Sequence, residues 1–144
     1  MNILLRTQVQ QDHHSVYKGF NESLFLQLSP PLLPFELNCF EGCETGDRVI
    51  LKVGLPLQVW ESLIVSHGSS SNEYYFVDEG VKLPFPLRKW HHRHGIEAID
   101  SGGTIISDEI TFSTGFKLID LLAYPLLYSI FAYRKAVYRR VFKH

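Results

Sequence analysis

The chain opens with a strand-like pattern and changes to helical spacing within 15 residues. Between positions 3 and 9 one face would carry Ile3, Leu5, Thr7 and Val9 and the other Leu4, Arg6 and Gln8, which is the period-2 pattern of a half-buried β-strand. Apolar residues then recur every four positions from Val16, and this spacing predicts one helix over 15–28. Ser29-Pro30-Pro31 should end that helix, because proline has no N–H donor and restricts the residue before it.

Short segments with strand character follow, separated by turn residues and not by helices. Ser101-Gly102-Gly103 is a strong signal for a hairpin turn. Strands at such short intervals favour an antiparallel meander over a parallel sheet. In one of them the pattern leaves open whether Trp60 or Glu61 points inward. We expect strands over 35–40, 48–53, 57–66, 73–79, 89–100 and 104–112.

The period changes once more after Gly115, where apolar residues lie three, four or seven positions apart. This stripe predicts a helix of about 25 residues within 115–143, which Pro125 should kink or split near Ala123. The order of elements predicts an α+β fold, a single domain over 1–144. In it a curved antiparallel sheet of about seven strands packs its apolar face against the last helix. The stripe consists of Ile119, Leu122, Leu126, Ile130, Val137 and Val141, interrupted at Tyr133-Arg134.

Composition excludes several classes of protein. Apolar residues make up 45% of the 144 and charged residues 20%, which fits a globular chain. No apolar stretch reaches the ~20 residues of a membrane-spanning helix, and the N-terminus lacks the apolar core of a signal peptide. Two cysteines, Cys39 and Cys43, are too few for a disulfide scaffold. We therefore expect a cytoplasmic protein with reduced thiols.

Charge is unevenly distributed, although the net charge is only −1. The near-neutral total argues against a nucleic-acid partner. Cations near the end of a helix interact favourably with its dipole and solvate its outer face. They would also permit weak contact with an anionic membrane surface. The last 24 residues contain no acidic residue but include Arg134, Lys135, Arg139, Arg140 and Lys143.

Motifs in the second half of the chain resemble those of a known family. Phe76-Val77-Asp78 and the later Pro84-Phe85, Trp90, His92 and His94 follow an F-x-D … G-P-F-x-x-W-x-H-x-H pattern. Asp108-Glu109-Ile110-Thr111-Phe112 and Ile130-Phe131-Ala132-Tyr133-Arg134 extend the likeness. The chain thus resembles the cyclase/dehydrase-like branch of the START-like superfamily (SRPBCC, or Bet v 1-like).

Two positions depart from the family pattern. Leu83 stands where the family has a glycine, and Ile96 stands where it has an aromatic residue. The resemblance implies a helix-grip fold whose members enclose lipids, sterols, polyketides or other apolar molecules between sheet and helix. Some members catalyse cyclisation or dehydration, so the family alone does not decide the function.

Ionisable residues fall on strand faces that are otherwise apolar. Alternation along the two strands of the predicted hairpin turns His92, His94 and Asp108 inward, and Phe76 and Asp78 share that orientation on the preceding strand. Burying charged groups is costly unless they are paired. We expect a cavity lined by Phe76, Asp78, Trp90, His92, His94, Asp108, Ile110, Phe112, Leu122, Leu126 and Ile130.

Three interpretations of these polar residues stay open. They form a structural network, orient a ligand in an apolar pocket, or transfer protons. The corresponding functions are an interaction module with a filled cavity, a binder of a small lipid-, sterol- or polyketide-like molecule, and a cyclase or dehydratase. The enzyme would use His92, His94 or Asp108 as acid–base groups. We favour the binder and expect no cofactor. No metal site is predicted, because spacing fixes no third ligand beside His-x-His.

The hairpin also predicts a contact between Asp108 and His94. Pairing across Ser101-Gly102-Gly103 places Asp108 either directly opposite His94 or opposite Ile96, one step away. In both registers the carboxylate lies near the imidazole. A buried pair of this kind should keep His94 protonated to a higher pH than a free histidine.

Overall fold

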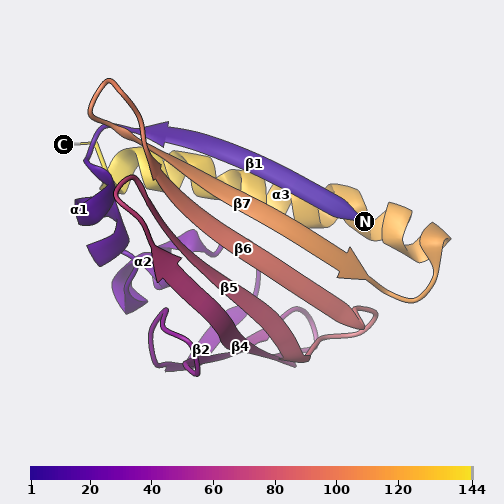
Figure 1. The fold of residues 1–144 in the computed structure, drawn as a ribbon. Coiled ribbons are helices and arrows are strands. Elements are labelled where there is room, and N and C mark those ends of the chain that lie inside the picture. Colours follow the sequence, from indigo (N-terminus) through magenta and orange to yellow (C-terminus); the bar gives the residue numbers. More distant parts are fainter. Residues whose placement is uncertain (144) are drawn as a thin grey trace.

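The computed structural model describes residues 1–143 and forms one antiparallel sheet with three helices (Figure 1). The sheet order is β1-β7-β6-β5-β4-β3-β2, so β1 pairs with β7 and all other neighbours are consecutive in the chain. The strands are β1 (Asn2–Val9), β2 (Phe35–Phe40), β3 (Arg48–Val53), β4 (Gln58–Ser69), β5 (Glu73–Lys82), β6 (Lys89–Ala98) and β7 (Thr104–Ser113). The helices are α1 (His13–Lys18), α2 (Glu22–Leu28) and α3 (Lys117–Val141).

The predicted α+β architecture is confirmed. Seven antiparallel strands pack against a long C-terminal helix, and α1 and α2 close one end of the molecule (Figure 1). The strands β4 and β5 run longer than predicted because they pair from Ser69 opposite Tyr74 at one end to Glu61 opposite Lys82 at the other. On β4 the structure turns Trp60 inward, where its ring meets the edge of the Trp90 ring at 4.7 Å between centroids.

The single helix predicted over 15–28 is wrong, since two short helices occupy this segment. The helix α1 ends at Gly19, whose N–H bonds to the Ser15 and Val16 carbonyls. Asn21 then caps α2, and its side-chain oxygen accepts a hydrogen bond of 3.0 Å from the Leu24 N–H. The apolar residues recur every four positions because Val16 of α1 and Leu24 of α2 pack into the same core.

The extent of α3 is close to the prediction, and Val137 of the predicted stripe is fully buried, but the stripe is wrong in the first half of the helix. Leu122 and Leu126 are 71% and 64% exposed, whereas Leu127 and Phe131 are buried. In this part of α3 the inward face therefore lies one residue further along the helix than the predicted stripe. Of the two effects predicted for Pro125, a kink or a split, the split is wrong, because α3 runs through Pro125 as one element.

Two apolar clusters form the core, and polar residues lie between them on β6. Trp90 belongs to one cluster with Phe112 and Phe131, and Ile96 belongs to the other with Tyr138. His92 and His94 occupy the two inward positions between Trp90 and Ile96 on the same strand. Among residues 1–143, no helix combines the length and the apolar character needed to cross a membrane.

Candidate functional site

The inward positions of three adjacent strands bring the predicted polar residues together. The register pairs His94 of β6 with Asp108 of β7 and with Phe76 of β5. It pairs His92 with Asp78 and thereby aligns all four ionisable side chains on one face. The inward orientation predicted for them is therefore confirmed, and all four are buried.

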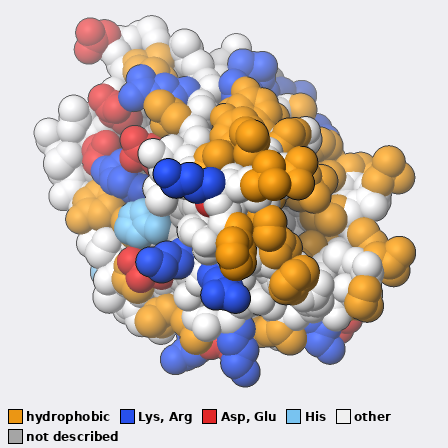
Figure 2. Space-filling model, turned by 90° about the vertical axis from the view of Figure 1, so that its right-hand side faces the viewer, with side chains coloured by type: hydrophobic (Ala, Val, Ile, Leu, Met, Phe, Trp, Pro, Cys, Tyr) orange, Lys and Arg blue, Asp and Glu red, His pale blue; other side chains and the backbone are white. Residues whose placement is uncertain are grey.

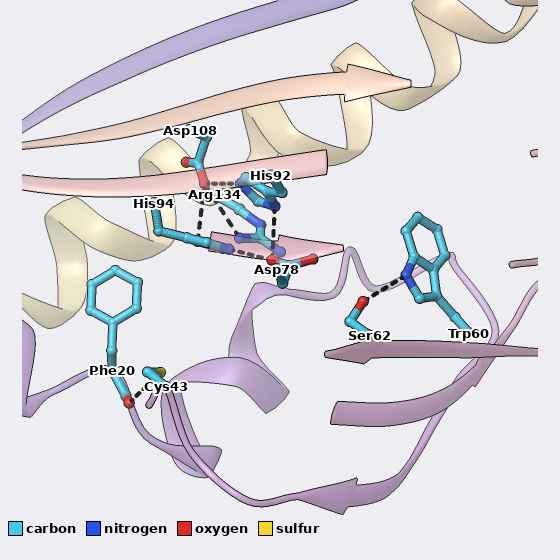
Figure 3. Close-up of polar contacts among 9 residues, drawn as sticks. All are labelled: Phe20, Cys43, Trp60, Ser62, Asp78, His92, His94, Asp108 and Arg134. Atoms are coloured by element: carbon cyan, nitrogen blue, oxygen red, sulfur yellow. Dashed lines mark hydrogen bonds and ion pairs between the residues drawn. The ribbon is translucent and has the colours of Figure 1, made fainter. Parts of the chain in front are cut away.

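The four side chains form two hydrogen-bonded His–Asp pairs (Figure 3). His92 Nε2 lies 2.8 Å from Asp108 Oδ1, and His94 Nε2 lies 2.7 Å from Asp78 Oδ2. A carboxylate only accepts, so the imidazole N–H donates in each pair. Both bonds run diagonally across the strands. The register places His92 directly opposite Asp78, and His94 directly opposite Asp108. The two imidazole rings stack with their centroids 3.6 Å apart.

Asp108 is thus close to His94, as predicted, but its hydrogen bond goes to His92. The distance from His94 Nδ1 to Asp108 Oδ1 is 3.7 Å, which is beyond a hydrogen bond. His94 Nδ1 is buried and has no hydrogen-bond partner among residues 1–143. One ring nitrogen of His94 is therefore buried without a hydrogen bond among the described residues.

Arg134 completes the cluster from the opposite side and was missed in the sequence. Its guanidinium comes from α3, is 12% exposed and lies over the Phe131 ring at 4.5 Å. Its Nη1 is 3.6 Å from Asp108 Oδ1. The charge pattern places Arg134 in a basic segment that was predicted to be solvated. Its spacing of three and seven residues from Phe131 and Leu127, both buried, was the available signal.

The carboxylates of the cluster are held in their charged form. Burial alone would raise the pKa of Asp108, but the hydrogen bond from His92 and the charge of Arg134 outweigh it and hold the pKa at about 2. Burial opposes the charge of Asp78 in the same way, and the hydrogen bond from His94 outweighs it, so the pKa is lowered. Both groups carry negative charge at neutral pH.

The prediction of a raised His94 pKa is wrong. Burial and the neighbouring His92 disfavour the imidazolium more than Asp78 stabilises it, and they lower the pKa of His94 to about 4. The prediction included only the attraction between the imidazolium and a carboxylate, which raises a pKa. Desolvation of the buried ring and the second histidine stacked on it both lower the pKa, and neither follows from the sequence pattern.

A cavity of about 160 Å³ opens against this cluster. Asp78, His92, His94 and Arg134 form its polar side, and the remaining walls are mainly apolar and aromatic. The walls come from α2, from the inward faces of β2 to β6 and from the middle of α3. Apolar residues on these walls include Phe20, Leu24, Phe40, Leu51, Trp60, Ile64, Leu127 and Phe131.

The predicted lining is right in part. Phe76, Asp78, Trp90, His92, His94 and Ile130 line the cavity. Asp108 lies behind His92 and positions it without lining the cavity. The prediction is wrong for Ile110 and Phe112, which are buried in the core beside Trp90, and for the exposed Leu122 and Leu126.

The contribution of α2 and of β2 to β4 was not predicted. These elements supply much of the apolar wall, including Leu24, Phe40 and Leu51. The apolar patterns of α2 and of β2 to β4 indicated that these side chains point inward. They did not indicate that an open cavity remains between the side chains. Packing between distant segments decides where a core is incomplete, and a single sequence does not show it.

Asp78, His92 and His94 also offer a possible set of metal ligands, with ligand atoms within 4.8 Å of one another. The two rings, however, are stacked with only 28° between their planes. Nitrogen lone pairs lie in the ring planes, so those of the two histidines run side by side and do not converge on one point. Both rings would have to turn before one ion could bind them. The arrangement favours the two His–Asp pairs.

Cys43 borders the cavity but is not suited to act as a nucleophile. Its thiol donates toward the Phe20 carbonyl at 3.6 Å, and burial raises its pKa to about 12. The reactive form of cysteine is the thiolate, which is scarce at neutral pH with such a pKa. Neither Cys39 nor Cys43 forms a disulfide.

No protein-family model and no curated protein matches the sequence. Solved structures match in fold: an uncharacterized protein from Bacillus thuringiensis has a TM-score of 0.69 at 15% identity, covering 99% of this chain and 98% of that one. The di-domain ARO/CYC BexL from the BE-7585A biosynthetic pathway has a TM-score of 0.63 at 12% identity, covering 94% of this chain and 45% of that one. A point mutant of Thalictrum flavum norcoclaurine synthase, in complex with a transition state analogue, has a TM-score of 0.61 at 9% identity, covering 95% and 93%.

These likenesses establish the Bet v 1-like helix-grip fold that the sequence motifs implied. At such low identity they establish the fold alone and no particular branch of the superfamily. Function must therefore be argued from the cavity and its polar side.

Proposed function

We propose that the protein binds a small, largely apolar molecule that carries one oxygen-bearing polar group. The observation that carries the proposal is the cavity itself, which is apolar on most sides and has a compact polar cluster on one. Ligand sites commonly combine apolar walls with a few placed polar groups that fix orientation.

Arg134 is the group best placed to receive the polar end of the ligand. It faces the cavity, and its nearest carboxylate contact, to Asp108, is 3.6 Å long. A guanidinium carries five N–H donors, so donors remain for an acceptor on the ligand. Asp78 and His94 also line the cavity and belong to the same polar side.

The charge of the cluster favours a neutral ligand group. Asp78 and Asp108 carry two negative charges against the single positive charge of Arg134, and His94 is neutral at pH 7. A ligand carboxylate would bring a third negative charge close to two buried carboxylates. A carbonyl or phenolic oxygen accepts from Arg134 without that cost.

The volume of the cavity indicates a ligand that is smaller than most lipid-, sterol- or polyketide-like molecules. A dry cavity of about 150 Å³ holds a benzene ring in another protein, and the cavity here is about 160 Å³. Pockets for larger organic ligands reach several hundred Å³, so we infer a ring-sized ligand and not a sterol or a two-chain lipid. The open volume also argues against an interaction module filled by its own side chains.

A second candidate is an enzyme of the cyclase or dehydratase type, in line with the resemblance to the cyclase/dehydrase branch. The two buried His–Asp pairs beside the cavity favour it, because such pairs can move protons. The fold is compatible with an enzyme, since norcoclaurine synthase shares it. The pKa of His94, about 4, is however far from the neutral range in which acid–base groups work best. Binding is therefore our first proposal.

The test begins with mass spectrometry of the native protein under non-denaturing conditions, to detect a molecule that co-purifies with it. A monocyclic phenol is then titrated against tryptophan fluorescence, because Trp60 and Trp90 both line the cavity. Arg134→Met should weaken binding at least tenfold, whereas Arg139→Gln, at an exposed position, should leave it unchanged. Equal affinity for the phenol in both variants would contradict the role given to Arg134.

A further inference from the structure

The first half of α3 exposes an apolar stripe to solvent. Leu118, Leu121, Leu122 and Leu126 are between 60% and 71% exposed. Their spacing of three, four and eight residues places them on one side of the helix. Four leucines on one exposed face are more than the scattered apolar residues of an ordinary surface.

The loops at the start of α3 extend this stripe. Phe116, just before the helix, is 60% exposed, and Phe85 in the β5–β6 connection is 83% exposed. A hydrogen bond of 2.8 Å from the Arg88 N–H to the Ser113 carbonyl holds that connection beside the end of β7. We call these six residues the α3 patch. Figure 2 views this end of the molecule and shows hydrophobic side chains gathered there, with Lys and Arg around them.

The exposed charges in the segments that carry the α3 patch have one sign. Lys82, Arg88, Lys89 and Lys117 are exposed in the segments that carry the patch. Residues 81–89 and 114–126 contain a single acidic side chain, Asp120. It is buried, and it accepts hydrogen bonds of 2.6 Å from the Thr114 N–H and hydroxyl. The surface is therefore apolar at its centre and cationic at its edge.

We propose that the α3 patch docks the protein on the surface of an anionic phospholipid membrane. Apolar side chains on a helix can enter the boundary between headgroups and acyl chains, and neighbouring cations meet the lipid phosphates. The cations argue for this occupant over a second copy of the chain. A two-fold dimer would place the same patch on itself and bring its cations together.

This docking surface is separate from the basic end of α3 and from the cavity. Arg139 lies almost six turns beyond Leu118 on α3, and Lys143 follows the end of the helix. None of the six patch residues lines the cavity. Membrane docking can therefore fail while ligand binding persists, and the reverse also holds.

The experiment is co-sedimentation of the full chain with vesicles of phosphatidylcholine, alone or with about one third phosphatidylserine. We expect binding to the anionic vesicles only, and we expect added salt to weaken it. Leu122→Asn/Leu126→Asn should reduce binding at least tenfold. The matched control is Leu4→Asn, because Leu4 is exposed on the sheet and pairs with Glu109.

Charge variants separate this surface from the end of the helix. Lys89→Gln/Lys117→Gln should weaken binding about fivefold for each charge removed, whereas Arg139→Gln/Lys143→Gln should leave it unchanged. Equal thermal denaturation midpoints would confirm that all variants fold.

Three results would overturn the proposal. One is equal binding of the wild-type protein to neutral and anionic vesicles, or no binding to either. Another is unchanged binding of the leucine double variant. The third is a dimer in light scattering that the leucine variant abolishes, because a second copy would then be the occupant.

Discussion

Replacing Asp108 by asparagine should destabilise the fold strongly while hardly changing its shape. The side chain is 3% exposed and accepts a hydrogen bond of 2.8 Å from His92 Nε2. It also lies 3.6 Å from the Arg134 guanidinium. The amide has the same size but no charge, so Arg134 would stay buried with Asp78 as the remaining carboxylate of the cluster.

The magnitude follows from the charges removed. Breaking a buried ion pair by removing one partner costs about 3–5 kcal/mol. Independently, a pKa held at about 2 in place of 3.8 corresponds to about 2 kcal/mol of stability at neutral pH. We therefore expect Asp108→Asn to lower the free energy of unfolding by about 3 kcal/mol, or the denaturation midpoint by ~10 °C.

The effect should depend on pH in a defined direction. The pKa of Asp108 is lower in the folded state than in the unfolded chain, so its stabilisation is complete above pH 3.8. It is lost as the pH falls from there to about 2. The difference in stability between wild type and variant should shrink over that interval.

Urea unfolding followed by circular dichroism at a series of pH values measures both effects. Glu109→Gln is the matched control on the next residue of β7, where the side chain is 48% exposed, and it should cost about 0.5 kcal/mol or less. If Asp108→Asn were as stable as wild type at pH 7, the buried charge network would not exist as described.

Two further predictions concern the same cluster and the cavity wall. The His94 imidazole should titrate in NMR well below its ordinary pKa of 6.5, near 4, so this residue should make the fold more stable as pH rises from about 4 to 6.5. His94→Gln should remove that rise, and a midpoint at or above 6.5 would contradict the assignment. Phe131→Ala should cost about 3 kcal/mol in urea unfolding, because the ring packs against Trp90 and His92 at 5.4 Å. Tyr128→Ala, at a 40% exposed position, should cost much less, and equal costs would argue against a packed wall.

The sheet and its polar residues were predictable because strand alternation has a strict period of two. The hairpin turn was enough to turn His94 and Asp108 inward and to leave two registers, of which the structure has the one that places them opposite each other. The actual partners were not predictable, because each imidazole reaches diagonally to the next residue pair. Which aspartate each histidine bonds depends on side-chain conformations, and the pattern of residue types does not predict these.

The helix was harder to interpret because α3 has apolar residues on more than one side. Two apolar stripes fit the helical period, one with Leu122 and Leu126 and one with Leu127 and Phe131. Only packing against the sheet decides that the second pair is buried and the first is exposed. Arg134 was missed for a related reason. A charged side chain is normally solvated, and its burial depends on Asp108 on a distant strand.

The cavity as a binding site is tested most directly by filling it. Val49 lines the cavity from β3, so Val49→Phe should occupy part of its 160 Å³. Val65→Phe makes the same change on β4 at a 37% exposed position outside the cavity. In titrations with a monocyclic phenol we expect saturable binding to the wild type and to Val65→Phe, and loss of binding in Val49→Phe with the fold intact. Equal binding by all three proteins would show that the ligand does not enter this cavity.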